Sequence, residues 1–248
     1  MVYTLALGAS AARRESSSLS IPTMNLENKT ILITGAASGI GHALAKLLIK
    51  KGAKVISFDI KEPLTHLENV QYEKVDIIKS SQIKRGLAKI KEPIDILINN
   101  AGVMRRGMLL ENSEEDFDLL FDVQVKGTWL MLKYAKNKLI NNATILQMSS
   151  RHGLSLPADP AIYGLCNNMI HEMSKILKDS YPHYKVKVAY PGPIETELSK
   201  YDCDGEAWEE KKKKMHAPNF IAEKLVELIT SEKIKLIFNE EKNEYYFE

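Results

Sequence analysis

Short apolar runs alternate with helical patterns along most of the chain after residue 30. Seven runs rich in β-branched residues predict strands at residues 30–34, 54–59, 70–76, 95–99, 143–148, 185–190 and 234–238. Helical periodicity between these runs predicts helices at residues 40–50, 80–91, 113–140, 161–180 and 218–230. Such alternation is typical of a parallel sheet with helices on both faces. We therefore expect an α/β protein with a single doubly wound Rossmann domain and a seven-stranded parallel sheet.

The first 23 residues differ in composition from the rest of the chain. They are rich in Ala, Ser and Arg, whereas the chain from Met24 onward is rich in Lys, Ile and Asn. A secretory signal is disfavoured, because the apolar stretch is short and its positive charge follows it. An organelle transit peptide, a cloning remnant and translation from an upstream start codon stay open as origins. We expect residues 1–23 to be a disordered extension and residues 24–248 to form the Rossmann domain.

Composition and charge exclude several classes of protein. The chain has 248 residues, 44% of them hydrophobic, which suffices for one large core. Its formal net charge of +2 provides no strong basic field for nucleic acid or for a membrane surface. No apolar run approaches the roughly 20 residues needed to cross a bilayer. Cys166 and Cys203 form neither a disulfide framework nor a metal site, so we expect a reducing, cytoplasmic setting and no metal.

A glycine-rich turn, TGAASGIG from Thr34 to Gly41, joins the first strand to the first helix. Glycines let the backbone turn tightly and approach a pyrophosphate at the helix N-terminus, although a plain tight connection would look the same. Asp59 favours the first interpretation, because it ends the second strand near the spacing of about 20 residues at which an acid meets an adenosine ribose. Its carboxylate would repel a 2′-phosphate, so we expect NAD rather than NADP, with nearby Lys61 softening the preference.

Five motifs resemble, in order, those of the short-chain dehydrogenase/reductase family over about residues 26 to 240. They are the glycine-rich turn, Asp76 after the third strand, NNAG at 99–102, MSS at 148–150 with Tyr163 after it, and PG at 191–192 with Thr196. The resemblance implies hydride transfer between NAD and a carbonyl or alcohol. Ser150 would hydrogen-bond the substrate oxygen, and Tyr163 would pass a proton to or from it. The cofactor would be held by Gly35, Ser38, Gly39, Ile40, Gly41, Asp59, Asp76, Ile77, Asn99, Ala101, Gly102, Tyr163, Asn167, Pro191, Gly192, Ile194 and Thr196.

Two positions of the implied catalytic set depart from the family pattern. Asn167 stands where the family has lysine, and Gln124 stands where it has an asparagine that holds a water for a proton relay to that lysine. Tyr163 and Asn167 are four residues apart on a helix and share one face. A unit charge at ~4 Å is worth about 4 kcal/mol at an effective dielectric of about 20, or ~3 pKa units. Without the lysine charge, we expect Tyr163 to stay neutral. A neutral tyrosine favours carbonyl reduction, which needs an acid, over alcohol oxidation, which needs a base.

Other charged and aromatic residues near these motifs have two interpretations. Lys126 is expected to leave its helix on a different side from Gln124, and His152 to be a packing or surface residue rather than a substrate contact. Arg105 and Arg106 are expected to be solvated rather than bound to an anionic substrate. Residues 195–216 correspond to the family's substrate lid, in which Trp208 either caps an apolar pocket or anchors the lid.

Two functions from different classes stay open. The favoured one is an NAD-dependent oxidoreductase that acts on a small-molecule carbonyl or alcohol, with Ser150, Tyr163, Asn167 and Gln124 forming a modified proton relay. The alternative is a catalytically impaired relative that binds dinucleotide as a sensor or interaction module. In the family, helices corresponding to 113–140 and 161–180 form dimer contacts, so we expect a homodimer or homotetramer.

Overall fold

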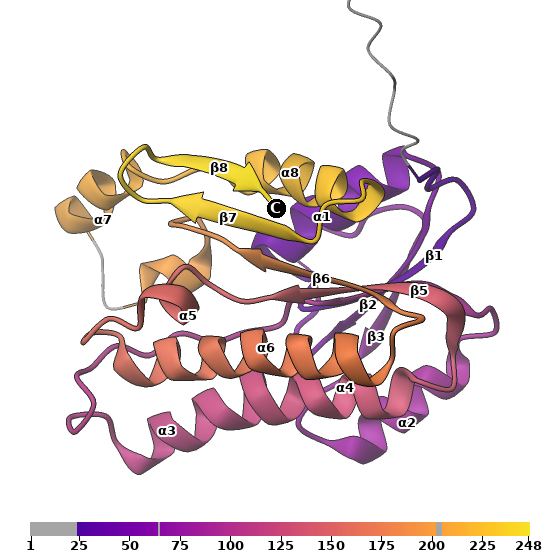
Figure 1. Ribbon diagram of the computed structural model, residues 1–248, viewed down its shortest axis with the longest axis horizontal. Coiled ribbons are helices and arrows are strands. Elements are labelled where there is room, and N and C mark those ends of the chain that lie inside the picture. The colour runs from indigo at the N-terminus through magenta and orange to yellow at the C-terminus, as the bar shows by residue number, and fades with distance from the viewer. Residues whose placement is uncertain (1–23, 64, 202–204) are drawn as a thin grey trace, which may run out of the picture.

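An eight-stranded sheet forms the centre of the molecule (Figure 1). The structure is a computed structural model, and it describes residues 24–63, 65–201 and 205–248. The predicted extension 1–23 lies outside the described residues. The strand order is β3-β2-β1-β4-β5-β6-β7-β8, and the first seven strands are parallel. The strands are β1 Thr30–Thr34, β2 Lys54–Asp59, β3 Val70–Lys74, β4 Ile94–Asn99, β5 Leu139–Met148, β6 Lys185–Tyr190, β7 Lys235–Asn239 and β8 Glu244–Phe247.

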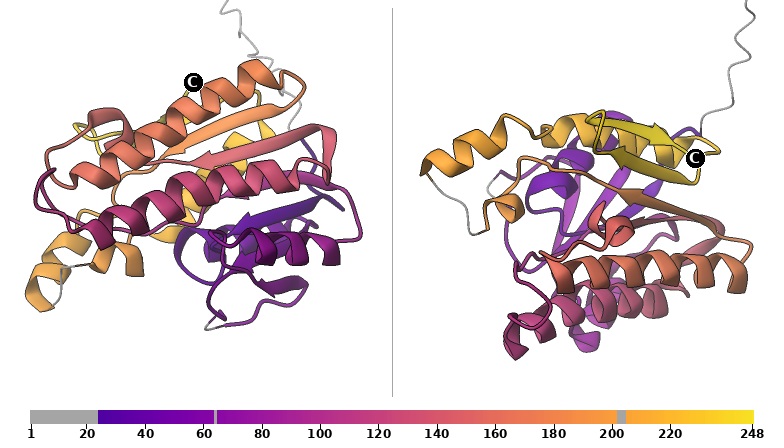
Figure 2. Two further views of the ribbon diagram at one scale, coloured as in Figure 1. Left: turned by 90° about the horizontal axis from the view of Figure 1, so that it is seen from below. Right: turned by 60° about the vertical axis from the view of Figure 1, so that its left-hand side comes forward.

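Helices cover both faces of this sheet (Figures 1 and 2). On one face α1 packs beside α8, and on the other α2, α4 and α6 lie together. Among the described residues, no helix is both long and apolar enough to cross a membrane. The helices are α1 Gly39–Lys50, α2 Ser80–Lys89, α3 Glu114–Leu120, the π-helix η1 Phe121–Gly127, α4 Thr128–Ala135, α5 His152–Ser155, α6 Ala161–Ser180, the 3₁₀ helix η2 Glu197–Lys200, α7 Gly205–Lys212 and α8 Pro218–Thr230.

The central strands are buried on both faces, which explains their continuous apolar sequences. All five residues of β1 are buried, and successive side chains point to opposite layers. Ile31 and Ile33 join the core beneath α1 and α8, whereas Leu32 joins the core beneath α2 and α4. The predicted class, a doubly wound α/β Rossmann fold, is confirmed, and the parallel strands bring their carboxyl ends to one edge.

The sheet has one strand more than the seven predicted. β8 pairs antiparallel with β7 and forms the last edge. Its sequence EYYF is short and lies between charged residues, so it carries no clear apolar alternation. The seven predicted strands are all parallel, and the eighth, antiparallel strand was not predicted.

The predicted helix 113–140 is also divided and shorter than expected. It consists of α3, the π-helix η1 and α4, and it ends at Ala135. β5 begins at Leu139 rather than at residue 143, with a register shift against β4 between Ile94 and Ile96. Asn142 lies at this irregularity and has a φ of 101°. The polar residues Asn141 and Asn142 interrupt the apolar run of β5, so the sequence pattern predicted a strand only from residue 143 onward.

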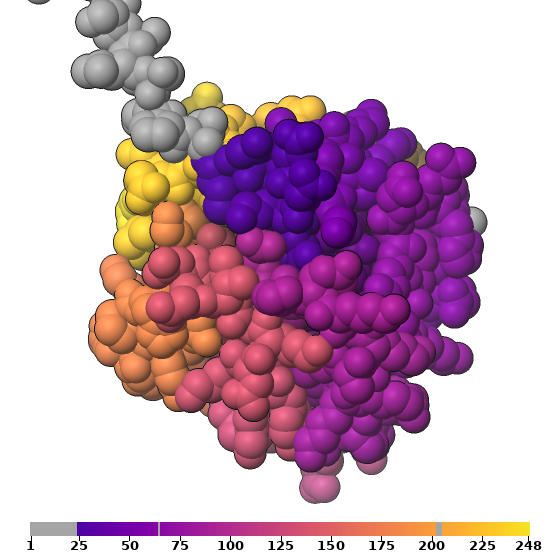
Figure 3. All heavy atoms as spheres, turned by 90° about the vertical axis from the view of Figure 1, so that its right-hand side faces the viewer, coloured from indigo at the N-terminus to yellow at the C-terminus, as the bar shows by residue number. Residues whose placement is uncertain are grey.

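The start of the described domain lies against its C-terminal part. Met24 donates its backbone N–H to the carbonyl of Thr230 at 2.9 Å, and Leu26 is buried in the core beneath α1 and α8. Figure 3 shows the resulting surface, on which the indigo N-terminal atoms adjoin the yellow C-terminal atoms. The chain from Met24 onward is thus tied into the fold.

Candidate active site

A cleft of about 340 Å³ opens at the carboxyl edge of the parallel strands. It is lined by the glycine-rich turn and by residues that follow β2, β3, β4, β5 and β6. Most of the predicted site residues line it: Gly35, Ser38, Gly39, Ile40, Asp59, Asp76, Ile77, Ala101, Gly102, Gln124, Ser150, Tyr163, Asn167, Pro191, Gly192, Ile194 and Thr196. Gly41 and Asn99 do not line it. Open α/β sheets bind ligands at this edge, where the strand order reverses.

The glycine-rich turn is held tightly against the NNAG segment. Gly35 has a φ of 72°, and a Cβ on Gly41 would lie 2.2 Å from the Gly35 carbonyl oxygen. The side-chain amide of Asn100 donates to the carbonyls of Thr34 and Gly35 at 3.0 and 2.9 Å. Gly41 therefore allows close backbone packing beneath the cleft. Asn100, which lies within NNAG, therefore fixes the turn.

Asp59 is positioned by two backbone amides at the rim of the cleft. Its carboxylate accepts hydrogen bonds from the N–H of Ala37 at 2.9 Å and of Lys61 at 3.0 Å. The first bond joins the end of β2 to the glycine-rich turn. Because each carboxylate oxygen accepts more than one hydrogen bond, Asp59 retains acceptor capacity toward the cleft.

Ser150, Tyr163 and Asn167 come together from two elements. Ser150 follows β5 and is buried, and Tyr163 and Asn167 lie one turn apart on α6. The Asn167 amide donates to the Tyr163 carbonyl at 2.8 Å. Burial raises the pKa of the Tyr163 phenol, while hydrogen bonds with the side chains of Ser150 and Asn167 lower it by less. The net effect is a raised pKa, so the phenol stays protonated at neutral pH.

Gln124 lies in the π-helix and reaches the same cleft. Gln124 is 3% exposed, and its Oε1 has no hydrogen-bond partner among the residues that the structure describes. Gly127 ends the π-helix, where a Cβ would lie 2.7 Å from Ile77 Cδ1. The π-helix thus packs closely beneath Ile77, and π-helical turns of this kind are frequent at functional sites.

His152 begins α5 beside Tyr163. The two ring centroids are 6.0 Å apart in an edge-on arrangement, and the buried Nδ1 of His152 has no hydrogen-bond partner within the described part of the chain. Burial, assisted by the charge of Arg151, lowers the pKa of His152 to about 4. His152 is therefore neutral near pH 7 and packs against Tyr163, which agrees with the packing interpretation.

The remaining charged candidates are engaged outside the cleft. Lys126 pairs with Asp122 at 2.9 Å on an exposed surface, as expected from its place on the helix. Arg105 pairs with Asp116 at 2.7 Å and Arg106 with Asp159 at 2.6 Å. None of these three cations lines the cleft.

Trp208 lies in α7, within the predicted lid. It is 8% exposed and does not line the cleft, and Lys200 lies over its ring at 5.6 Å from the centroid. These contacts agree with an anchor for the lid rather than a cap on the pocket. Residues 202–204 of the predicted lid lie outside the described residues.

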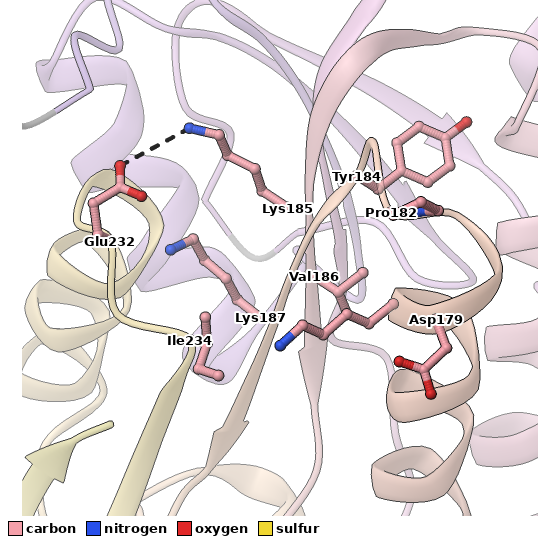
Figure 4. Close-up of a pocket in the computed structure, with 9 residues that line it drawn as sticks. Asp179, Pro182, Tyr184, Lys185, Val186, Lys187, Glu232 and Ile234 are labelled. Carbon is pink, nitrogen blue, oxygen red and sulfur yellow. Dashed lines mark ion pairs between the residues drawn. The ribbon is translucent and has the colours of Figure 1, made fainter.

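A second cavity, of about 470 Å³, lies at the opposite end of β6 (Figure 4). Lys187 is buried there and donates to the carbonyls of Ser231 and Lys233 at 2.7 and 2.5 Å. Lys185 pairs with Glu232 at 4.0 Å. The Lys187 amine satisfies carbonyls that follow the end of α8, which explains why a lysine is buried at this position.

Comparison with known proteins defines the class to which this site belongs. Residues 29–207 match the family model described as short chain dehydrogenase. Oxidoreductase UcpA of Salmonella typhimurium is 34% identical over 191 residues, which cover 70% of this chain and 72% of that protein. NAD-dependent glycerol dehydrogenase of Listeria innocua is 32% identical over 209 residues, covering 79% of this chain and 82% of that protein. The chain therefore belongs to the short chain dehydrogenase family, and it is similar to proteins that are named as oxidoreductases or dehydrogenases.

Solved structures share the same fold. The 3-ketoacyl-(acyl-carrier-protein) reductase from Brucella melitensis, complexed with NADH, has a TM-score of 0.70 and 25% identity, covering 83% of this chain and 92% of that one. A short chain dehydrogenase from Burkholderia cenocepacia, in complex with NADP, has a TM-score of 0.76 and 23% identity, covering 86% of this chain and 88% of that one. Both dinucleotides thus occur among structures with this fold.

Proposed function

We propose that the protein is an NAD-dependent oxidoreductase that interconverts a small-molecule carbonyl and alcohol, with Tyr163 as the proton donor or acceptor. The observation that carries the proposal is that Tyr163 and Ser150 line the same cleft, with a phenol that burial keeps protonated at neutral pH. This pair provides a hydrogen-bond donor and a proton source for one substrate oxygen.

The cleft fits a dinucleotide at both of its ends. At one end, Gly35 and Gly41 keep the turn close to the N-terminus of α1, whose first amides have no partner within the helix. At the other end, a Cβ on Gly192 would lie 2.4 Å from the Phe238 ring, so the loop after β6 is also tightly packed. When bound, the nicotinamide ring would supply or receive the hydride.

The preference for NAD over NADP rests on Asp59. Its carboxylate would accept hydrogen bonds from the ribose hydroxyls and repel a 2′-phosphate. Asp76 and Ile77 would border the adenine, and Asn99 to Gly102 would support the middle of the cofactor from beneath. Since structures with this fold bind NADH in one case and NADP in another, the fold itself does not decide the preference.

The proton chemistry of Tyr163 would favour reduction near neutral pH. A phenol with a raised pKa is protonated and ready to donate, whereas oxidation requires the phenolate as base. Ser150 would hold the substrate oxygen, and the Asn167 amide would bond the nicotinamide ribose without adding charge. Gln124 lines the cleft, its buried Oε1 has no hydrogen-bond partner among the described residues, and the side chain would take part in the modified relay.

A catalytically impaired dinucleotide-binding protein is the second candidate. Of the described residues that line the cleft, Lys61 alone carries a positive charge, and its backbone lies beside Asp59 rather than Tyr163. No cation therefore assists ionisation of the tyrosine, which is the observation that favours this alternative.

Cofactor titration followed by a substrate screen separates the two candidates. Wild-type protein and Tyr163→Phe are titrated with NADH and NADPH, and then assayed with a broad set of carbonyls and alcohols. The enzyme proposal predicts that both proteins bind NADH, that NADPH binds more weakly, and that turnover requires the tyrosine hydroxyl. Tight NADH binding by the wild type without turnover of any compound would support the binding protein instead.

We also propose that the protein self-associates through α4 and α6. Their outer faces expose large apolar side chains, including Trp129 at 47%, Leu165 at 40%, Met169 at 40% and Ile176 at 66%. A run of such residues along one helix is unusual for a surface that faces only water. A homodimer or homotetramer would bury it.

A further inference from the structure

The C-terminal hairpin of β7 and β8 reaches the same end of the sheet as α5 and α7 (Figure 1). The two strands pair antiparallel, and Phe238 lies opposite Tyr245 in their register. Lys242 donates its backbone N–H to the Asn239 side chain at 3.1 Å, which closes the turn between the strands. The hairpin is thus an ordered element at the end where the cleft opens.

Tyr245 contacts the loop of residues 191–196 that lines the cleft. Its hydroxyl accepts a hydrogen bond from the N–H of Gly192 at 3.0 Å. The Phe238 ring packs directly on Gly192, leaving no room there for a Cβ, and its centroid lies 5.2 Å from that of Tyr245. Phe238 and Tyr245 therefore both hold Gly192 in place.

The far end of the same loop is also fixed against Tyr245. His216 donates its backbone N–H to the Pro193 carbonyl at 3.1 Å and accepts from the N–H of Glu195 at 3.0 Å. The ring of His216 lies 5.5 Å from that of Tyr245 and stacks on Phe220 at 4.7 Å. Tyr245 thus contacts the loop both directly and through His216.

The hairpin turn contacts the segment that carries Ser150 as well. Arg151, the residue after Ser150, forms an ion pair with Glu240 in the turn. The N–H of Arg151 also donates to the Pro191 carbonyl at 3.0 Å. The end of β5 and the loop after β6 are therefore joined to one another and to the hairpin.

We infer that Tyr245 is a positioning residue, which holds the 191–196 loop in the conformation that receives the nicotinamide end of the cofactor. The inference rests on the proposed function, because it assigns that loop to the nicotinamide. Burial raises the pKa of the Tyr245 hydroxyl to about 12, so it remains a neutral hydrogen-bonding group over the working pH range. The adenosine end of the cleft lies at the glycine-rich turn and Asp59, and the hydrogen bond of Tyr245 is made at Gly192, at the other end of the 191–196 loop from Thr196, which approaches Gly39.

Comparison of NAD⁺ with ADP-ribose tests this assignment, because ADP-ribose lacks only the nicotinamide. The two ligands are titrated into wild-type protein, Tyr245→Phe and the control Tyr246→Phe. Tyr246 is the next residue on β8, is 44% exposed, and its side chain points to the opposite face of the sheet from that of Tyr245. Loss of one net hydrogen bond should raise the dissociation constant by roughly two- to tenfold. Tyr245→Phe should therefore weaken NAD⁺ binding by that factor and leave ADP-ribose binding unchanged, and Tyr246→Phe should alter neither.

The other outcomes overturn the inference in distinguishable ways. Equal weakening of both ligands by Tyr245→Phe would show a general structural role, and unchanged NAD⁺ binding would show that the Gly192 contact positions nothing. If wild-type protein bound neither ligand, the proposed function would fail and this inference with it. If the wild type bound NAD⁺ but Tyr245→Phe did not weaken NAD⁺ binding more than ADP-ribose binding, only the inference would fail.

Discussion

Replacing Asn167→Lys should lower the pKa of Tyr163 and extend alcohol oxidation to lower pH. Asn167 is 2% exposed, and its side-chain amide donates to the backbone carbonyl of Tyr163 one helical turn away. A lysine from the same Cα can bring its ammonium to ~4 Å from the phenolic oxygen. That charge is worth about 4 kcal/mol at an effective dielectric of about 20, equivalent to ~3 pKa units.

The observed shift should be smaller than this upper value for two reasons. The lysine itself loses hydration at a buried position, which lowers its own pKa and reduces the charge present. It also replaces an amide that already lowers the pKa of the Tyr163 phenol. We therefore expect the acidic limb of the pH profile for oxidation to move down by at least one unit but by less than ~3.

The assay is the pH dependence of alcohol oxidation at fixed ionic strength, with cofactor saturating. Asn167→Met is the matched control, because methionine has nearly the length of lysine without its charge. It should leave the acidic limb where the wild type has it. If Asn167→Lys binds cofactor and substrate normally and its acidic limb also stays in place, then the missing charge does not set the proton chemistry and the reasoning fails.

Three further predictions follow from individual contacts. Asp59→Asn should raise NADPH affinity relative to NADH, measured by calorimetric titration at one salt concentration, and an unchanged ratio would remove the basis for the NAD assignment. The folded-state pKa of His152 is about 4, below the unfolded value of 6.5, so the unfolded chain binds more protons in this window and stability should fall as pH drops from 6.5 to 4. His152→Gln should flatten that part of the urea-unfolding profile, and an unaltered slope would contradict the assignment. Leu165→Lys on α6 should reduce the sedimentation mass of the assembly, whereas an unchanged mass would place the interface elsewhere.

The fold class could be predicted because the central strands are buried on both faces. Continuous apolar runs such as TILIT at residues 30–34 have no other simple interpretation when helical patterns separate them. The edge strand β8 could not be predicted, because EYYF has charged neighbours and pairs on one side only. The position of β8 depends on its pairing with β7 and on the turn between these two strands, and the sequence of residues 244–247 alone does not indicate that pairing.

The cleft residues could be located because parallel strands bring their carboxyl ends together. Motifs far apart in the sequence, such as Asp59 and Ser150, therefore line one cavity. The π-helix around Gln124 could not be foreseen, since FDVQVKG also fits an ordinary α-helix. The contact of Tyr245 with Gly192 was equally hidden, because it depends on the unpredicted strand β8.

The most direct test of the account is single-turnover reduction by protein loaded with NADH, using a carbonyl compound that the wild type accepts. The account assigns the transferred proton to Tyr163, whose raised pKa keeps it protonated at neutral pH. Nicotinamide absorbance should decay in the wild type at pH 7, while Tyr163→Phe should bind NADH equally well and lose most of that decay rate. An equal decay rate in the two proteins would contradict the central claim that Tyr163 supplies the proton.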